Sequence, residues 1–199
     1  MGETKTAAQV DAHTRILDAA VEQLRRHGHA KTGVVDVARA LGISHAAVYR
    51  HFDSKEALFD AVAERWLAAV SQQLEEIVGR RGTAASRVED WLLALIAIKR
   101  RKVTEDPEMF ATYHAVAEGA HEVVSAHVAR LRDQLRRIIA DGIASGEFKV
   151  SDADSGAAAV FNATAYFHHP YFVRESKADE AAARRVVRLI LAGLKAGDI

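Results

Sequence analysis

The sequence predicts an all-α fold, and three observations support that prediction. Ala and Leu are abundant and only two Pro occur in 199 residues, a composition that favours helices. Apolar residues recur along most of the chain at the spacing of one helix face. The alternation of Val, Ile and Thr with polar residues that is typical of strands is scarce. We therefore expect about nine helices, of which three short ones lie close to the N-terminus.

The three N-terminal helices are predicted from their caps and breaks. The first is expected over residues 11–27, because Gly28 is suited to a left-handed C-terminal cap. The second is expected over residues 34–41. The third begins after Ser44, whose hydroxyl makes a good N-cap, and ends near residue 51.

Longer helices are expected in the rest of the chain. Ser54 caps a helix that carries apolar residues as far as Ile77. The next helix begins near Arg87 and ends in the basic run 99–102, which we interpret as a solvated C-terminal cap. Pro107 at a first helical position then predicts another helix start.

The last part of the chain predicts three further helices. One covers residues 120–144. The next begins near residue 152, where Ser151 and Asp154 resemble a capping box, and Pro170 should kink or end it. The final helix covers residues 179–196.

Composition and charge exclude several classes of protein. Without Cys there is no disulfide framework and no thiolate metal site, which favours a reducing, cytoplasmic setting. The N-terminus lacks the apolar segment of a signal peptide, and no stretch approaches the roughly 20 apolar residues of a membrane span. The net charge is zero, although residues 37–55 contain Arg39, Arg50 and Lys55 against Asp53 alone. A small positive surface on a neutral protein is compatible with DNA binding through few phosphate contacts.

The stretch VVDVARALGISHAAVYRHFDSKEALF, residues 34–59, predicts a helix-turn-helix. Ala38 is small enough for a second helix to approach the first, and Gly42 tolerates the positive φ of a tight turn. Four apolar residues have the spacing that fills the wedge between the two helices: Val37, Leu41, Ile43 and Val48. A helical hairpin without DNA-binding function could show the same pattern.

The second of these helices directs several side chains away from the wedge. The outward positions are Ser44, His45, Ala46, Tyr49 and Arg50. Ala46 and Ala47 are short and would let the helix backbone come close to a duplex. Arg50 could pair with guanine O6 and N7 or hold a phosphate, and both roles stay open. Phe52 is expected to pack against the first helix.

Residues 11–60, with ILDAAVEQL followed by TGVVDVARALGISHAAVYRHFDSKEALF, resemble the N-terminal domain of TetR-family (TetR/AcrR-type) transcriptional regulators. The resemblance implies a homodimeric all-α protein of two domains. Residues 1–56 would bind operator DNA, and residues 57–199 would bind an effector and dimerise. The function implied is that of a repressor released from a palindromic operator by a small-molecule effector, without a cofactor.

The resemblance also implies roles for single residues. Tyr49, Lys55 and the Thr32-Gly33 start of the second helix match positions that contact phosphates, and His51 matches a position that is often His or Tyr. This chain departs from the family pattern at Gly33, where a hydroxyl residue is frequent, so the phosphate contact would fall to backbone N–H groups. Ala46 and Ala47 also replace a common Gly and a common hydroxyl residue.

The C-terminal half predicts an effector cavity and a dimer interface. Aromatic, Met and His residues are the candidates for the cavity, although each could be ordinary core: Trp91, Met109, Phe110, Tyr113, His114, His121, Phe161 and Tyr166. Small and apolar residues of the last helices are the candidates for a four-helix dimer bundle, unless they serve the core of one subunit: Ala157, Phe161, Ala165, Val187, Ile190, Leu191 and Leu194.

Other functions fit the sequence less well. No histidine pair has the four-residue spacing of a helical metal site, so no metal site is predicted. The chain contains no P-loop, GxSxG or HExxH motif and no Cys nucleophile, so an enzyme is not expected. A small-molecule binding protein with a vestigial helix-turn-helix remains an alternative, as do an activator and a metal-responsive regulator.

Overall fold

The computed structural model describes residues 2–118, 122–175 and 180–198, and every regular element in those ranges is helical. The chain divides into two compact units. Unit 1 contains Met1–Trp66 and Asp106–Val124, and unit 2 contains Leu67–Glu105 and Ser125–Ile199. The functional boundary expected after residue 56 stays a prediction. No helix of the described residues is both long and apolar enough to cross a bilayer.

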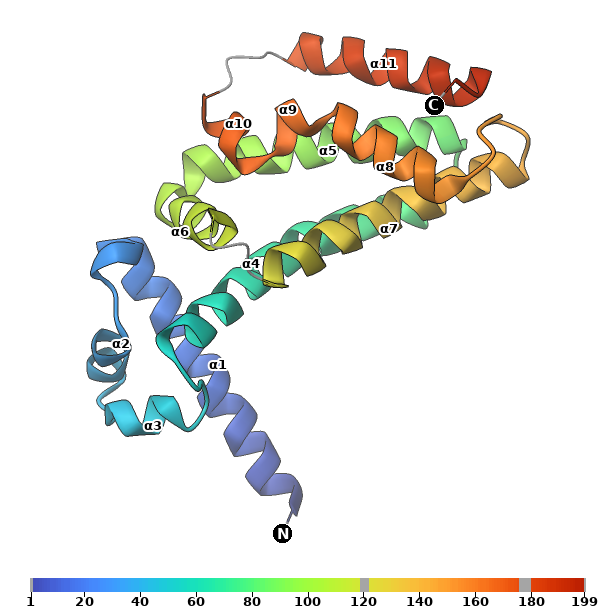
Figure 1. Cartoon of the computed structure of the whole chain (residues 1–199). Helices are drawn as coiled ribbons and strands as arrows, with labels where there is room; N and C mark the ends of the chain where they lie inside the picture. Colours follow the sequence, from blue (N-terminus) through green and yellow to red (C-terminus); the bar gives the residue numbers. More distant parts are fainter. Residues whose placement is uncertain (1, 119–121, 176–179, 199) are drawn as a thin grey trace. The chain divides into compact units, whose positions relative to one another are not determined.

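Unit 1 contains α1 (Gly2–His27), the 3₁₀ turn η1 (His29–Lys31), α2 (Val34–Leu41), α3 (His45–Tyr49), the start of α4 (Lys55–Val78) and α6 (Pro107–Glu118). Helices α2 and α3 follow one another beside α1, and α6 also packs on α1 (Figure 1). The predicted left-handed cap is confirmed, because Gly28 has φ 74° and donates its N–H to the Leu24 carbonyl at 2.8 Å. Helix α1 begins at Gly2, nine residues before the predicted start.

An apolar seam and an ion pair hold unit 1 together. Leu24 of α1, Val37 of α2 and Val48 of α3 are fully buried. Burial of each such side chain stabilises the fold by about 1.5–3 kcal/mol. Arg25 and Asp106 pair at 2.8 Å between α1 and the start of α6.

Unit 2 contains the rest of α4, α5 (Ala84–Glu105), α7 (Glu122–Ala144), α8 (Ala153–Ala163), α9 (Ala165–His168), α10 (Pro170–Glu175) and α11 (Glu180–Ala196). Helix α5 contacts α9, α10 and α11 (Figure 1). Its core is one apolar cluster that includes Leu74 of α4, Leu92 of α5, Leu135 of α7, Val160 of α8 and Leu194 of α11. Because every long helix of unit 2 contributes to this cluster, the core fixes which faces of these helices point inward.

Two sequence predictions in unit 2 were wrong in detail. Helix α8 is capped by Asp152, whose carboxylate accepts the Ser155 N–H at 2.7 Å, so the predicted capping box was displaced by one residue. The helix ends before Pro170, at Thr164, whose hydroxyl donates to the Val160 carbonyl at 2.9 Å. Pro170 then starts α10, where its missing N–H is not needed.

Gly142 in α7 gives a direct test of this packing. A Cβ at this position would lie 2.2 Å from Cδ2 of Phe148 and 2.9 Å from Cβ of Ala84. We predict that Gly142→Ala lowers the free energy of unfolding by about 1–3 kcal/mol, because overpacking outweighs the higher helix propensity of Ala. Urea denaturation followed by circular dichroism measures the change.

Gly79→Ala is the matched control, because a Cβ there meets no heavy atom within 4 Å. It should change the free energy of unfolding by less than about 0.5 kcal/mol. Equal stability of the two variants would contradict the packing described for Gly142.

Candidate nucleic-acid interface and ligand site

The turn between α2 and α3 has the geometry that the sequence predicts. Gly42 adopts the left-handed conformation with φ 65° and ψ 30°, and the Ile43 N–H donates to the Ala38 carbonyl at 3.0 Å. Ser44 is the N-cap of α3, because its Oγ accepts the Ala47 N–H at 3.2 Å. Val48 is buried, whereas Ile43 is 37% exposed and fills the predicted wedge only in part. Helix α3 is therefore fixed at its start and along one face.

Most of the remaining surface of α3 and of its two cap residues is open to solvent. Ser44, His45, Ala46 and Arg50 are exposed, Ala47 is half-buried, and Tyr49 is 45% exposed. The rings of His45 and Tyr49 meet edge to face with centroids 6.4 Å apart. Among the described residues, the Arg50 guanidinium forms no hydrogen bond or ion pair, so all its donors can serve a bound molecule.

The groups predicted to contact phosphate at the start of α2 form hydrogen bonds within the protein itself. Thr32 is 1% exposed, and its hydroxyl donates to the carbonyls of Gln23 and Gly28 at 3.2 and 2.9 Å. The N–H of Gly33 donates to Oδ2 of Asp36 at 2.9 Å. The Asp36 carboxylate thus lies where a phosphate would approach the helix N-terminus.

Two further predicted contact residues follow α3: His51 lies in the turn after it, and Lys55 is the first residue of α4. Lys55 is half-buried, with its Nζ 5.2 Å from the centroid of the Phe59 ring. His51 is half-buried, and its ring centroid lies 6.4 Å from that of His13 in α1. Phe52 is buried against the same His13 ring at 4.7 Å, which confirms its predicted packing on α1.

The predicted effector-pocket residues are distributed between the two units. In unit 1, Met109, Phe110 and Tyr113 are buried, and the Tyr113 ring lies 5.2 Å from that of Trp66. Burial raises the pKa of the Tyr113 hydroxyl to about 12. His114 is half-buried, and His121 lies outside the described residues.

The remaining pocket candidates lie in unit 2. Trp91 is fully buried in the apolar core. Phe161 is half-buried, with its ring 4.5 Å from that of His168, and Tyr166 is 49% exposed. A single pocket formed by all these residues stays a prediction.

A chain of polar side chains crosses the interior of unit 2 between α4, α7 and α5. The Ser71 hydroxyl donates to the Leu67 carbonyl at 3.3 Å and lies 3.2 Å from Nδ1 of His127. Nε2 of His127 lies 3.5 Å from Nζ of Lys99. Since the Ser71 proton is used by Leu67, Nδ1 of His127 carries the imidazole proton and Nε2 accepts from the Lys99 amine.

A buried amide extends this chain. The indole N–H of Trp91 can only donate, and it reaches Oε1 of Gln134 at 3.1 Å. This fixes the amide orientation, so Nε2 of Gln134 donates to the Ser71 carbonyl and to Oε2 of Glu75, each at 2.8 Å. Helices α4, α5 and α7 are thus joined by hydrogen bonds inside the core.

Burial controls the charges of these groups. Lys99 is 2% exposed, and burial, aided by the charge of Lys102, lowers its pKa to about 7. Burial, together with the charges of Lys99, Arg130 and His168, lowers the pKa of His127 to about 2. Burial likewise lowers the pKa of His168 to about 4. The histidines are therefore neutral at pH 7, and the lysine is poised between its two forms.

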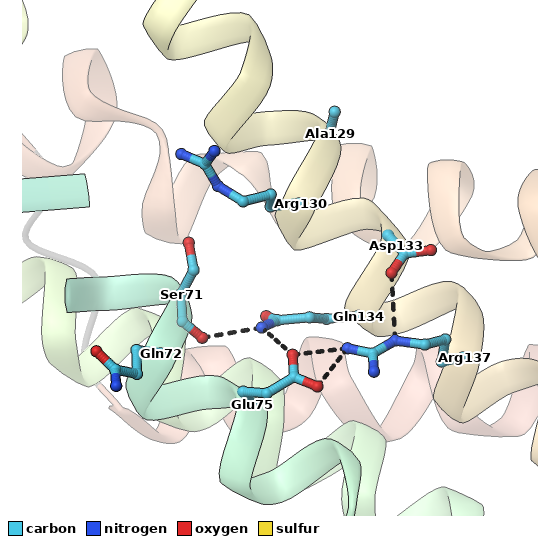
Figure 2. A pocket seen from close by; sticks show the side chains of 8 residues that line it. All are labelled: Ser71, Gln72, Glu75, Ala129, Arg130, Asp133, Gln134 and Arg137. Carbon is cyan, nitrogen blue, oxygen red and sulfur yellow. Dashed lines mark hydrogen bonds and ion pairs between the residues drawn. The ribbon is translucent and has the colours of Figure 1, made fainter. Parts of the chain in front are cut away.

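A cleft of about 480 Å³ lies between α4 and α7 in unit 2. Figure 2 shows the side chains that line it: Ser71, Gln72, Glu75, Ala129, Arg130, Asp133, Gln134 and Arg137. The Arg137 guanidinium pairs with Glu75 at 2.6 Å and with Asp133 at 3.2 Å. Among the described residues Arg130 has no such pair, and in Figure 2 no dashed contact reaches it. The buried polar chain therefore ends at a solvent-accessible cleft.

Two domain families match different parts of the chain. Residues 16–62 match the family described as "Bacterial regulatory proteins, tetR family". Residues 84–187, which make up more than half of the chain, match "Tetracyclin repressor-like, C-terminal domain". The chain belongs to the TetR family.

Relatives and solved structures agree with membership of the TetR family. The HTH-type transcriptional repressor Rv1474c of Mycobacterium tuberculosis is 35% identical over 124 residues, which cover 60% of this chain and 64% of that protein. A TetR/AcrR-family regulator from Thermobifida fusca has the same fold with a TM-score of 0.67 and 21% identity, covering 92% of this chain and 98% of the other. The regulator FadR from Bacillus subtilis, in complex with stearoyl-CoA, gives a TM-score of 0.62 at 19% identity, covering 92% and 98%.

The residues expected at the dimer interface of this TetR-family protein mostly lie in its own core. Ala157, Val187, Ile190, Leu191 and Leu194 are buried in the apolar cluster of unit 2. Phe161 and Ala165 are half-buried. On α11 a large apolar side chain that is exposed is instead Leu189, at 73%. The role of these helices in a dimer stays a prediction.

Sequence reasoning missed the buried polar residues of this TetR-family protein. Lys99 was wrongly interpreted as part of a solvated cap, although it continues the stripe formed by Leu92 and Leu95. His127 and Gln134 likewise lie four residues before and three after the buried position 131. Their positions on apolar stripes could have identified all three. No group of three or more metal-ligating side chains forms among the described residues.

The buried histidines predict sensitivity to acid. Below pH 6.5 the unfolded chain protonates His127, whereas the folded chain does not until about pH 2, so the stability falls as the pH falls. We predict that the wild type loses roughly 2 kcal/mol more than the His127→Gln variant between pH 6.5 and 4.5. Urea denaturation at several pH values measures this difference.

The exposed His27 provides the control. His27→Gln should keep the wild-type slope of stability against pH. An unchanged slope in His127→Gln would show that the imidazole takes up a proton in the folded state.

Proposed function

We propose that this protein is a transcriptional regulator that inserts α3 into the major groove of operator DNA. The observation that carries the proposal is the two-sided character of α3. Val48 is buried, while His45, Tyr49 and Arg50 are exposed to solvent. A five-residue helix with an open polar face has the dimensions of a recognition helix.

The open face contains groups for both kinds of DNA contact. Arg50 can reach guanine O6 and N7 with two parallel hydrogen bonds from its planar guanidinium. Tyr49 suits a phosphate oxygen or a thymine methyl group. Because the charge of Asp36 opposes a phosphate at the start of α2, binding depends more on α3 and Lys55 than the resemblance alone implies.

One copy of α3 contacts only a few base pairs, so specific binding to an operator needs two copies. A dimer would place them about 34–36 Å apart, in successive major grooves of a palindromic operator. The proposed homodimer is supported by exposed apolar side chains of unit 2, since Leu189 is 73% and Tyr171 61% exposed. Leu189 lies on α11, one of the helices expected to pair, and Tyr171 lies on α10.

We propose further that a small-molecule effector releases the protein from DNA, which makes it a repressor. A relative that carries the name repressor and a fold neighbour bound to stearoyl-CoA support this proposal. Helix α4 is the element that would couple the two events, because its first residues belong to unit 1 and its last to unit 2. Effector and DNA must weaken each other's binding by the same factor.

Selection of bound duplexes from a random pool tests the function. We predict enrichment of a palindrome whose affinity falls linearly with the logarithm of salt concentration, because phosphate contacts release counterions. Fluorescence anisotropy at several salt concentrations measures the slope. Enrichment of no sequence, with no salt-dependent binding, would favour a small-molecule binding protein with a vestigial helix-turn-helix.

Arg50→Ala tests the recognition helix. We predict that it relaxes the base preference at one position in each half-site, with a loss of about 1–3 kcal/mol on the preferred sequence. Repeating the selection with the variant measures both effects. Arg132→Ala, an exposed residue of α7 in unit 2, is the control and should leave the preference unchanged. A uniform loss on all sequences with Arg50→Ala would instead assign this residue to a phosphate.

A further inference from the structure

The polar chain in unit 2 places a hydrogen-bond donor of the buried His127 directly behind Ser71, which lines the cleft. Nδ1–H of His127 donates to Ser71, and Ser71 also lines the cleft between α4 and α7. Ser71 and Gln134 both line the cleft and are both more than nine-tenths buried. A ligand that displaced the Ser71 hydroxyl would find the imidazole N–H already oriented by Lys99 on its other side.

The charges around this donor favour an anion. The groups that lower the pKa of His127 by their charge are Lys99, Arg130 and His168, and all three are basic. Arg130 comes from the same face of α7, three residues after His127, and lines the cleft. The acidic residues of the cleft, Glu75 and Asp133, are paired with Arg137. Since the two histidines are neutral at pH 7, the positive charge at the Ser71 end comes from Arg130 and the charged form of Lys99, and it favours an anion over a cation.

We propose that the cleft between α4 and α7 binds a small organic acid whose carboxylate accepts hydrogen bonds from Nδ1–H of His127 and from Arg130. That the cleft binds an acid does not depend on the function proposed above. That this acid is the effector rests on that proposed function. Lys99 acts from behind the imidazole, because an ammonium that donates to Nε2 makes Nδ1–H a stronger donor. The volume of the cleft, about 480 Å³, accommodates an aromatic or short aliphatic acid.

Binding of the acid should be accompanied by proton uptake. Burial lowers the pKa of Lys99 to about 7, so at pH 7.5 a large part of the protein holds the neutral amine. A carboxylate nearby favours the charged amine, and the protein then takes up a proton. His127 stays neutral throughout, since its pKa lies far below this pH. A neutral ligand in the same cleft would cause no such uptake.

Matched pairs of probes test the ligand class. Benzoate and octanoate are compared with benzamide and octanamide by calorimetry at pH 7.5 on the full chain, in HEPES and in Tris. We expect at least one acid to bind at least tenfold more tightly than its amide, with uptake of about half a proton per ligand. Amides that bind as tightly as their acids, or no binding of either acid, would overturn the proposal.

Three variants test the residues. Lys99→Met, His127→Gln and Arg130→Gln should each weaken binding of the acid at least tenfold, and Lys99→Met should abolish proton uptake. Arg130 is exposed, so its variant should fold even if a core variant does not. Arg132→Gln changes an exposed residue of the same helix that does not line the cleft, and it should bind within twofold of the wild type. Wild-type affinity in Arg130→Gln would contradict the proposed anion site.

The DNA assay separates this inference from the proposed function. In the wild type the acid should release the selected duplex, whereas Arg130→Gln should bind the duplex normally and resist release. Binding of acid by a protein that binds no duplex would overturn the regulator function and support the acid site. Duplex binding by a protein that binds amides as tightly as acids would support the regulator function and overturn the acid site.

Discussion

The geometry of the proposed DNA-recognition helix depends on the burial of Val48. Helix α3 spans five residues, and a helix of that length is not stable in water by itself. It persists because Ser44 caps its first turn and Val48 is fully buried, as is Val37 of α2. The same burial turns Tyr49 and Arg50 outward, since they lie one and two positions beyond Val48, and His45 at the start of the helix is exposed as well. Fold stability and the proposed readout of DNA are thus decided by one side chain.

A second constraint governs unit 2, where polar groups are buried between α4, α5 and α7. Taking Lys99, His127 and Gln134 out of water is unfavourable, and hydrogen bonds offset that loss only if each group finds a partner. A core built for stability alone would have apolar residues at these three positions. Buried titratable groups with strongly shifted pKa values that end at a cleft are instead typical of ligand sites.

The fold was predictable where local chemistry decides the structure. Gly42 and Ser44 were predicted correctly because a left-handed turn and an N-cap each need particular residues, whatever surrounds them. Lys99 was not predicted, because a basic residue near the end of a helix has the same local pattern whether solvent or another helix covers it. The break at Thr164 was missed for a similar reason, since Thr is common within helices and only its bond to the Val160 carbonyl marks the end.

The candidate dimer residues illustrate the general limit of such reasoning. An apolar stripe predicts burial but does not identify the surface that buries it. Val187 and Leu194 continue the stripe of α11 and are covered by α5 and the rest of the unit 2 core. Leu189 lies off that stripe, and its large apolar side chain is exposed to solvent. For the proposed dimer, Leu189 is therefore a better candidate contact than the residues that follow the main periodicity of α11.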